Sequence, residues 1–123
     1  MYSEIVLEHY RHPRNSGEMA EATSVVEVTN PVCGDLLKLS VLVREGKIVD
    51  AKFRTQGCIP AVACASWLTE FMRGRNAAEL RAVTPEQIEK GLGGLPRASH
   101  HAAALAADAL RAVLMNLTGQ QTA

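Results

Sequence analysis

The sequence predicts a single α+β domain in which a three-stranded antiparallel sheet carries helices on one face. Three apolar segments with the spacing of strands follow one another across short turns, and the remainder of the chain has the spacing of helices. Because the strands are consecutive and do not alternate with helices, the α+β class is favoured over a parallel α/β fold. The length of 123 residues suits one compact domain, so the whole chain, 1–123, is assigned to it.

The elements before the predicted sheet and within it are short. A helix is predicted over 2–11, with Ser3 as its N-cap and Pro13 ending it. Strands are predicted over 24–29, 37–44 and 48–55, with a hairpin turn at Glu45-Gly46-Lys47 and an antiparallel meander as the result. The residues predicted to face inward are Leu37, Leu39, Val41 and Val43 in the second strand and Val49, Ala51 and Phe53 in the third.

The second half of the chain is predicted to be helical. Pro60 suits the first turn of a helix that continues to Gly74, and Thr84 caps a shorter helix that ends at Lys90. A last helix is expected from Ser99 or His100 to about Leu117, followed by a frayed tail over 118–123.

Composition narrows the classes of function. Basic and acidic residues number 13 each, so charge gives no reason to expect nucleic acid or an acidic membrane as a partner. No apolar run approaches the roughly 20 residues of a membrane span, and the first 14 residues have no signal-peptide core. A cytoplasmic protein with reduced cysteines is therefore expected.

Four residues with metal-binding side chains are predicted to meet at one end of the sheet. Cys33 and Asp35 open the second strand, and Cys58 follows the third, whose end lies beside that opening in a meander. The start of the last helix, which carries His101, can cover this end. Two thiolates, a carboxylate and an imidazole form a ligand set for zinc or iron. At the start of a helix, the pKa of the Cys58 thiol is expected to be lowered.

Simpler interpretations fit the same residues. Cys33 and Cys58 are equally compatible with buried structural cysteines, and neighbouring histidines at a helix start are often exposed caps. Cys64 lies between alanines on an apolar face and is interpreted as a core residue, whereas His9 and His12 are interpreted as surface residues. An enzyme with Cys58 as nucleophile and a histidine base is a third hypothesis, but no sequence feature suggests its substrate pocket.

Several separated motifs nevertheless resemble one family, the IscU and NifU N-terminal scaffolds of iron–sulfur cluster assembly. The resemblance extends from Tyr2 to about Leu114 and includes the opening segment 2–17. It is carried by Cys33-Gly34-Asp35, by Gly57-Cys58 with Ala61 and Leu68-Thr69-Glu70-Phe71, and by Leu95-Pro96, His101, Leu105 and Ala107-Asp108-Ala109. The chain lacks the insertion between the second and third motifs that marks the SufU branch, so it is closer to the IscU branch.

The resemblance implies a scaffold that is not an enzyme, with the α+β fold described above. A cysteine desulfurase would supply sulfur, and iron or a labile [2Fe–2S] cluster would be held and passed to apo-proteins. The implied ligands are Cys33, Asp35, Cys58 and His101, with zinc able to occupy the site in the purified protein. A paralogue that binds zinc or the desulfurase without assembling clusters remains the alternative.

Two positions depart from the family pattern. Its third cysteine, a ligand and persulfide acceptor, directly follows the histidine, and here that position is Ala102. The chaperone-recognition segment Leu-Pro-Pro-Val-Lys is replaced by residues 95–99, Leu-Pro-Arg-Ala-Ser. The resemblance therefore leaves two questions, whether cluster assembly survives without the third thiolate and whether a chaperone docks.

Overall fold

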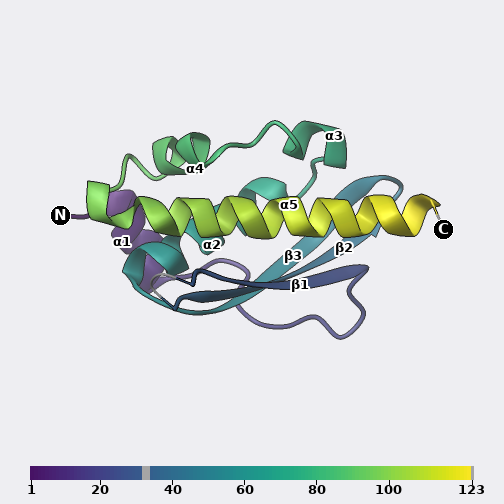
Figure 1. The fold of residues 1–123 in the computed structure, drawn as a ribbon, viewed down its shortest axis with the longest axis horizontal. Helices are drawn as coiled ribbons and strands as arrows, with labels where there is room; N and C mark the ends of the chain where they lie inside the picture. Colours follow the sequence, from purple (N-terminus) through teal and green to yellow (C-terminus); the bar gives the residue numbers. More distant parts are fainter. Residues whose placement is uncertain (32–33, 123) are drawn as a thin grey trace.

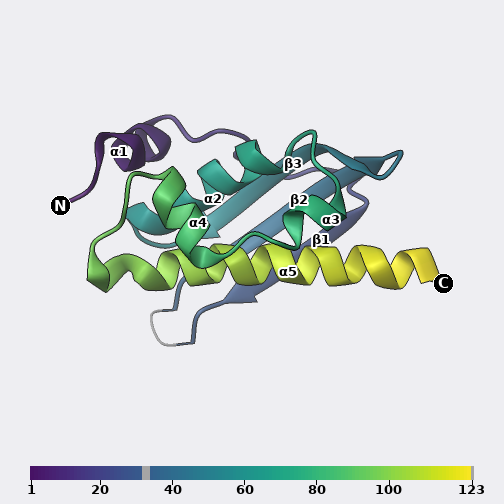
Figure 2. The same ribbon diagram turned by 90° about the horizontal axis from the view of Figure 1, so that it is seen from above.

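The computed structural model describes residues 1–31 and 34–122 and shows a three-stranded sheet covered by helices on one face (Figure 1). Strands β1 (Ser24–Thr29), β2 (Leu36–Arg44) and β3 (Lys47–Gln56) are antiparallel and lie in the order β1-β2-β3. Helices α2 (Ile59–Met72) and α5 (His100–Thr122) lie across this sheet, as the view from above also shows (Figure 2). The predicted α+β meander is confirmed.

The shorter helices begin at side-chain caps. Helix α1 (Glu4–Arg11) begins where the Ser3 side chain accepts the Val6 N–H, and α4 (Pro85–Gly91) begins at Thr84, both as predicted. Helix α3 (Ala77–Leu80) was not predicted, although Asn76 and Glu79 form a capping box at its start, which is a readable sequence signal. The 3₁₀ turn η1 (Arg97–Ser99) precedes α5, and α5 continues to Thr122, beyond the end predicted near Leu117.

A β-bulge corrects the predicted facing of β3. Leu42 pairs with Asp50 but Val43 pairs with Ile48, so Val49 is an extra residue on its strand. Side chains in a strand change face at every residue, so the extra residue exchanges the inward and outward positions in the part of β3 nearest the hairpin. Val49 is consequently 39% exposed and Ile48 takes its place in the core, so the prediction that Val49 faces inward is wrong.

The segment between α1 and β1 crosses the outer face of the sheet. Asn15 and Gly17 exchange backbone hydrogen bonds with Phe53 at the edge of β3, and Glu18 then forms ion pairs with the outward side chains of Lys38 and Arg54. Since β1 lies at the opposite edge, residues 17–23 must pass from one edge to the other. Ser40 alternates with the inward-facing Leu39 and Val41 and so lies on the outer face, yet it is buried at 2% exposure, which agrees with such a cover.

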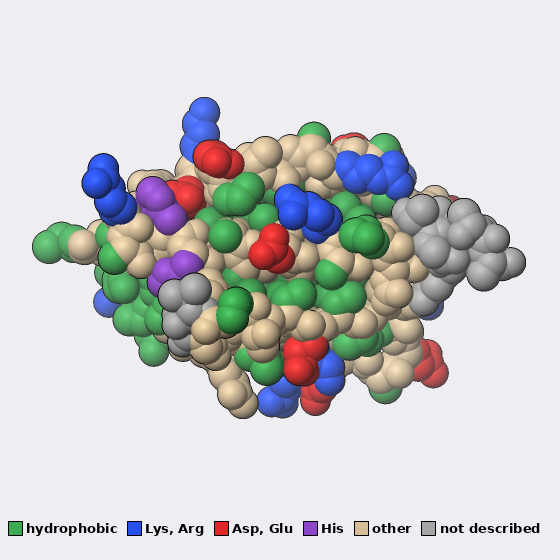
Figure 3. Space-filling model, viewed as in Figure 1, with side chains coloured by type: hydrophobic (Ala, Val, Ile, Leu, Met, Phe, Trp, Pro, Cys, Tyr) green, Lys and Arg blue, Asp and Glu red, His purple; other side chains and the backbone are tan. Residues whose placement is uncertain are grey.

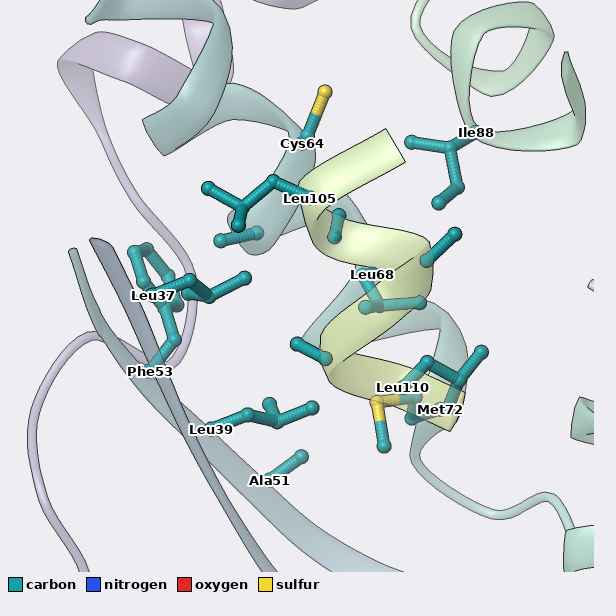
Figure 4. Packing of buried hydrophobic residues seen from close by; sticks show 14 of the residues in the cluster. Leu37, Leu39, Ala51, Phe53, Cys64, Leu68, Met72, Ile88, Leu105 and Leu110 are labelled. Atoms are coloured by element: carbon teal, nitrogen blue, oxygen red, sulfur yellow. The ribbon is translucent and has the colours of Figure 1, made fainter. Parts of the chain in front are cut away.

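The core lies between the sheet and the helical layer. Helix α2 contacts α1, α4, α5 and β3, so its side chains are buried on several sides. Cys64 has no exposed surface, and Figure 4 shows its side chain among the core residues and directed away from Leu37 and Phe53 of the sheet. Its assignment to the core is confirmed, and burial raises the pKa of its thiol to about 12. No helix in the described ranges is long and apolar enough to cross a membrane.

One histidine predicted to lie on the surface belongs to a buried polar cluster. His9 is 5% exposed, and its Nδ1 lies 2.7 Å from the Oγ of Ser66 in α2. The same Oγ accepts the backbone N–H of Arg14 at 2.9 Å, so the Ser66 hydroxyl satisfies two groups of the N-terminal segment. Ser66 therefore fastens α1 to α2, whereas His12 is exposed as predicted.

Candidate metal centre

Asp35 lies at the start of β2, as the sequence predicts. The residue is largely buried, at 8% exposure, and its backbone oxygen accepts the N–H of Asn30. Gly34 directly before it has φ +77°, a conformation that glycine adopts without strain. This backbone conformation thus favours glycine at position 34, and it sets the position of Asp35 at the start of β2.

Cys58 lies at the N-cap of α2, directly after the end of β3. The pairing of Leu36 with Gln56 confirms that the start of β2 lies beside the end of β3. This register brings together Asp35 and Cys58, which are 23 residues apart in the chain. The Cys58 Sγ donates a hydrogen bond to Asp35 Oδ2 over 3.4 Å.

His101 lies in the first turn of α5. Its Nδ1 is 3.1 Å from the backbone oxygen of Ala98. Because a carbonyl oxygen can only accept, Nδ1 carries the proton and the lone pair of the neutral ring is on Nε2. The carbonyl of the η1 turn therefore orients the imidazole as such partners orient metal-ligating histidines. Histidine side chains are visible at the end of the molecule where α5 begins (Figure 3).

Asp35, Cys58 and His101 converge on one point. His101 Nε2 lies 3.7 Å from Asp35 Oδ2 and 3.8 Å from Cys58 Sγ. Ligand bonds of about 2.0 to 2.3 Å at tetrahedral angles place ligand atoms roughly 3.3 to 3.8 Å apart, which is close to these separations. The donor set and its spacing therefore fit one metal ion.

The protonation of Cys58 differs from the prediction. Burial raises the pKa of its thiol above the usual value, and the hydrogen bond and negative charge of Asp35 add to this effect. The backbone N–H groups of Cys58 and Ala61 act in the opposite direction but do not prevail, so the expected lowering at the helix start is wrong for the metal-free protein. A cation that binds here has to displace the thiol proton.

Two other cysteine positions bear on the ligand set. Cys33, the fourth predicted ligand, lies outside the described residues. Cys64 is enclosed in the core, and its high thiol pKa makes it a poor source of thiolate. Ala102, where the family pattern has a cysteine, is 1% exposed and directly follows His101. Among the described residues, the structure thus brings three of the four predicted ligands together.

Sequence reasoning overlooked two groups that shape the site. The Ala98 carbonyl that orients His101 is a backbone atom, so no residue type signals it. Gly57 was noted only as part of a motif, although it lies against the Asp35 carboxylate. A glycine next to a candidate ligand, at a place where two backbones approach, is the signal that could have revealed it.

Comparison of the sequence with known proteins identifies the family of this chain. Residues 1–123 match the family model described as the NifU-like N terminal domain. The chain is 41% identical over 116 residues to "Iron-sulfur cluster assembly scaffold protein IscU 1" of Archaeoglobus fulgidus, covering 94% of this chain and 76% of that protein. It is 37% identical over 126 residues to "Iron-sulfur cluster assembly scaffold protein IscU" of Escherichia coli K12, covering 99% and 98%.

A solved structure agrees in fold. The N-terminal part of a nitrogen-fixing NifU-like protein from Brucella abortus superposes with a TM-score of 0.79, at 21% identity, over 95% of this chain and 94% of that one. The family model matches residues 1–123, and the Escherichia coli relative covers 99% of the chain. The chain therefore belongs to the NifU-like N-terminal domain family.

Proposed function

We propose that this protein is an iron–sulfur cluster assembly scaffold. It binds iron, or a labile [2Fe–2S] cluster as cargo, through Asp35, Cys58 and His101 together with Cys33. It receives sulfur from a cysteine desulfurase and passes the cluster to apo-proteins. The observation that carries the proposal is the convergence of Asp35 Oδ2, Cys58 Sγ and His101 Nε2, all within 4.8 Å of one another.

The local chemistry supports binding and release more than turnover. Cys58 supplies a soft thiolate once its proton is released to solvent, and Asp35, the acceptor of that hydrogen bond in the metal-free protein, then faces the cation as a carboxylate. His101 directs its Nε2 towards the other two groups without turning its ring, because the backbone oxygen of Ala98 accepts a hydrogen bond from Nδ1. A scaffold needs ligands that bind its cargo reversibly, and no catalytic step is assigned to these residues.

The substitution at Ala102 makes a labile cluster the expected cargo. Thiolate is the preferred ligand of iron–sulfur clusters, and this position has none to offer. Mixed cysteine and histidine ligation has precedent in Rieske centres, so the remaining set is chemically sufficient. The names of the relatives at 37 to 41% identity agree with scaffold function.

The test is anaerobic reconstitution followed by visible absorption. The purified protein is supplied with ferrous iron, cysteine and a cysteine desulfurase, and cluster absorption is compared between wild type, Cys58→Ala and Cys64→Ala. These variants make the same chemical change, at the site and in the core respectively. Wild type and Cys64→Ala should form the cluster, whereas Cys58→Ala should not.

Transfer completes the test. The loaded protein is mixed with an apo-ferredoxin, and appearance of the ferredoxin's cluster is followed in the presence of a chelator that captures free iron. Cluster formation without transfer would contradict the proposed delivery to apo-proteins and would indicate a protein that only stores clusters. Stoichiometric zinc that iron cannot displace would contradict the proposal and identify a zinc-binding paralogue.

A further inference from the structure

Gly57 occupies a position at the candidate metal centre where no side chain has room. A Cβ built on this residue would lie 3.0 Å from Cγ and 3.2 Å from Oδ1 of Asp35, and 3.0 Å from the Cβ of Ala61. Nonbonded carbon atoms prefer separations of about 3.5 to 4.0 Å, so both contacts are too close. Even one methyl group at this position therefore requires a neighbour to move.

The requirement for glycine here is one of space and not of backbone conformation. Gly34, Gly74 and four other glycines have positive φ, where any larger residue is strained. Gly57 is not among them, so alanine can adopt its backbone conformation. An effect of a Gly57→Ala substitution must then come from the two contacts.

The Asp35 side chain is the neighbour that is freer to move. Ala61 lies in the first turn of α2, where the main-chain position of its Cβ is set by the helix. The Asp35 carboxylate is the end of a rotatable side chain, held on its Oδ2 by the 3.4 Å hydrogen bond from Cys58. A methyl group at Gly57 would push this carboxylate from the position in which it faces Cys58 and His101.

We propose that Gly57 is a positioning residue for Asp35: its missing side chain lets the carboxylate join Cys58 and His101 as a third ligand. The inference rests on the proposed function of this site and names the residue that sets its oxygen ligand. Loss of a group that orients a metal ligand typically weakens metal affinity about 10- to 100-fold. Gly57→Ala should weaken affinity by a similar factor although it removes no ligand atom.

A double-mutant cycle tests the mechanism. Zinc affinity is measured by competition with a chromophoric chelator for wild type, Gly57→Ala, Asp35→Ala and the double variant. Gly57→Ala should bind zinc at least about tenfold more weakly than wild type. In the Asp35→Ala background, adding Gly57→Ala should change affinity less than about twofold, because the residue it acts through is gone.

A spectroscopic measurement separates positioning from a general loss of structure. Cobalt(II) reports its ligands through visible absorption, so Gly57→Ala should give the spectrum of Asp35→Ala and not that of wild type. Thermal unfolding of the metal-free proteins is recorded beside it. If Gly57→Ala does not fold, Gly57→Ala with Ala61→Gly removes the second close contact, and that variant should fold and still bind zinc weakly.

Each outcome bears either on the metal site as a whole or on Gly57 alone. Wild type that binds neither zinc nor cobalt would contradict the proposed function itself. Wild type that binds, with Gly57→Ala equal to it in affinity and spectrum, would overturn only the role of Gly57. Equal losses in both backgrounds of the cycle, or full recovery of affinity by Ala61→Gly, would show that Gly57 serves the start of α2 and not Asp35.

Discussion

Replacing Ser66 by alanine should destabilise the fold by about 1 to 3 kcal/mol. The hydroxyl lies 2.7 Å from His9 Nδ1 and accepts the Arg14 N–H at 2.9 Å, and Ser66 itself has no exposed surface. Alanine would leave both partners without this oxygen. An unsatisfied buried polar group costs about 1 to 3 kcal/mol, and the loss at His9 gives the predicted range, because the Arg14 contact is only partly buried and is not counted in full. A typical domain has only about 5 to 15 kcal/mol of stability, so the loss is large.

The assay is equilibrium unfolding in urea, followed by circular dichroism and by the fluorescence of Trp67, the single tryptophan and the neighbour of Ser66 in α2. Ser16→Ala is the matched control, because it removes the same hydroxyl from an exposed residue and should change stability by less than about 0.5 kcal/mol. A loss below about 1 kcal/mol for Ser66→Ala, with an unchanged denaturant slope, would refute the reasoning, since the buried His9 would then have found another partner.

Three further predictions concern pH, the ligand set and packing. Burial, followed by the charge of Arg14, lowers the folded-state pKa of His9, so stability should be complete above the unfolded value of about 6.5 and fall as the pH drops through the folded value; urea unfolding between pH 5 and 8 should show this decline, and His9→Asn should flatten it. Ala102→Cys restores a thiolate beside His101 and should slow cluster loss to a chelator; equal loss rates would show that Ala102 is not the weak point. Gly91→Ala would place its Cβ 2.3 Å from the indole of Trp67 and should lower stability by about 1 to 3 kcal/mol, visible as a lower urea midpoint and a changed tryptophan emission.

Local patterns were sufficient to predict most elements of the fold. The predicted β1 has the bounds of the observed strand, and Ser3 and Thr84 cap the helices for which they were proposed. These features depend on neighbours within a few residues, which the sequence displays directly. The bulge at Val49 could not be predicted in the same way, because it depends on how β3 matches β2 across the hairpin.

In the candidate site too, contacts that follow from local patterns could be predicted, and contacts that depend on distant packing could not. The meander alone predicts that Asp35 and Cys58 meet, and their 3.4 Å contact confirms it. The approach of His101 depends on the packing of α5 against the rest of the domain, and its identification relied on resemblance. His9 was assigned to the surface because a polar residue in a short helix is usually exposed, and its partner Ser66 is 57 residues away in the chain. Burial of polar groups by distant partners is the information that a local pattern lacks.

The site also links the occupancy of the scaffold to its stability. Asp35, Cys58 and His101 come from the start of β2, the start of α2 and the start of α5, which meet only when the whole domain is folded. An unfolded chain cannot present this ligand set, so anything bound there shifts the folding equilibrium by mass action, by about 2.7 kcal/mol at a free concentration 100 times the dissociation constant. When the cargo is delivered, the protein loses this added free energy of unfolding. The empty protein is thus the form with the smaller margin against unfolding, and the form on which proteases and chaperones should act first.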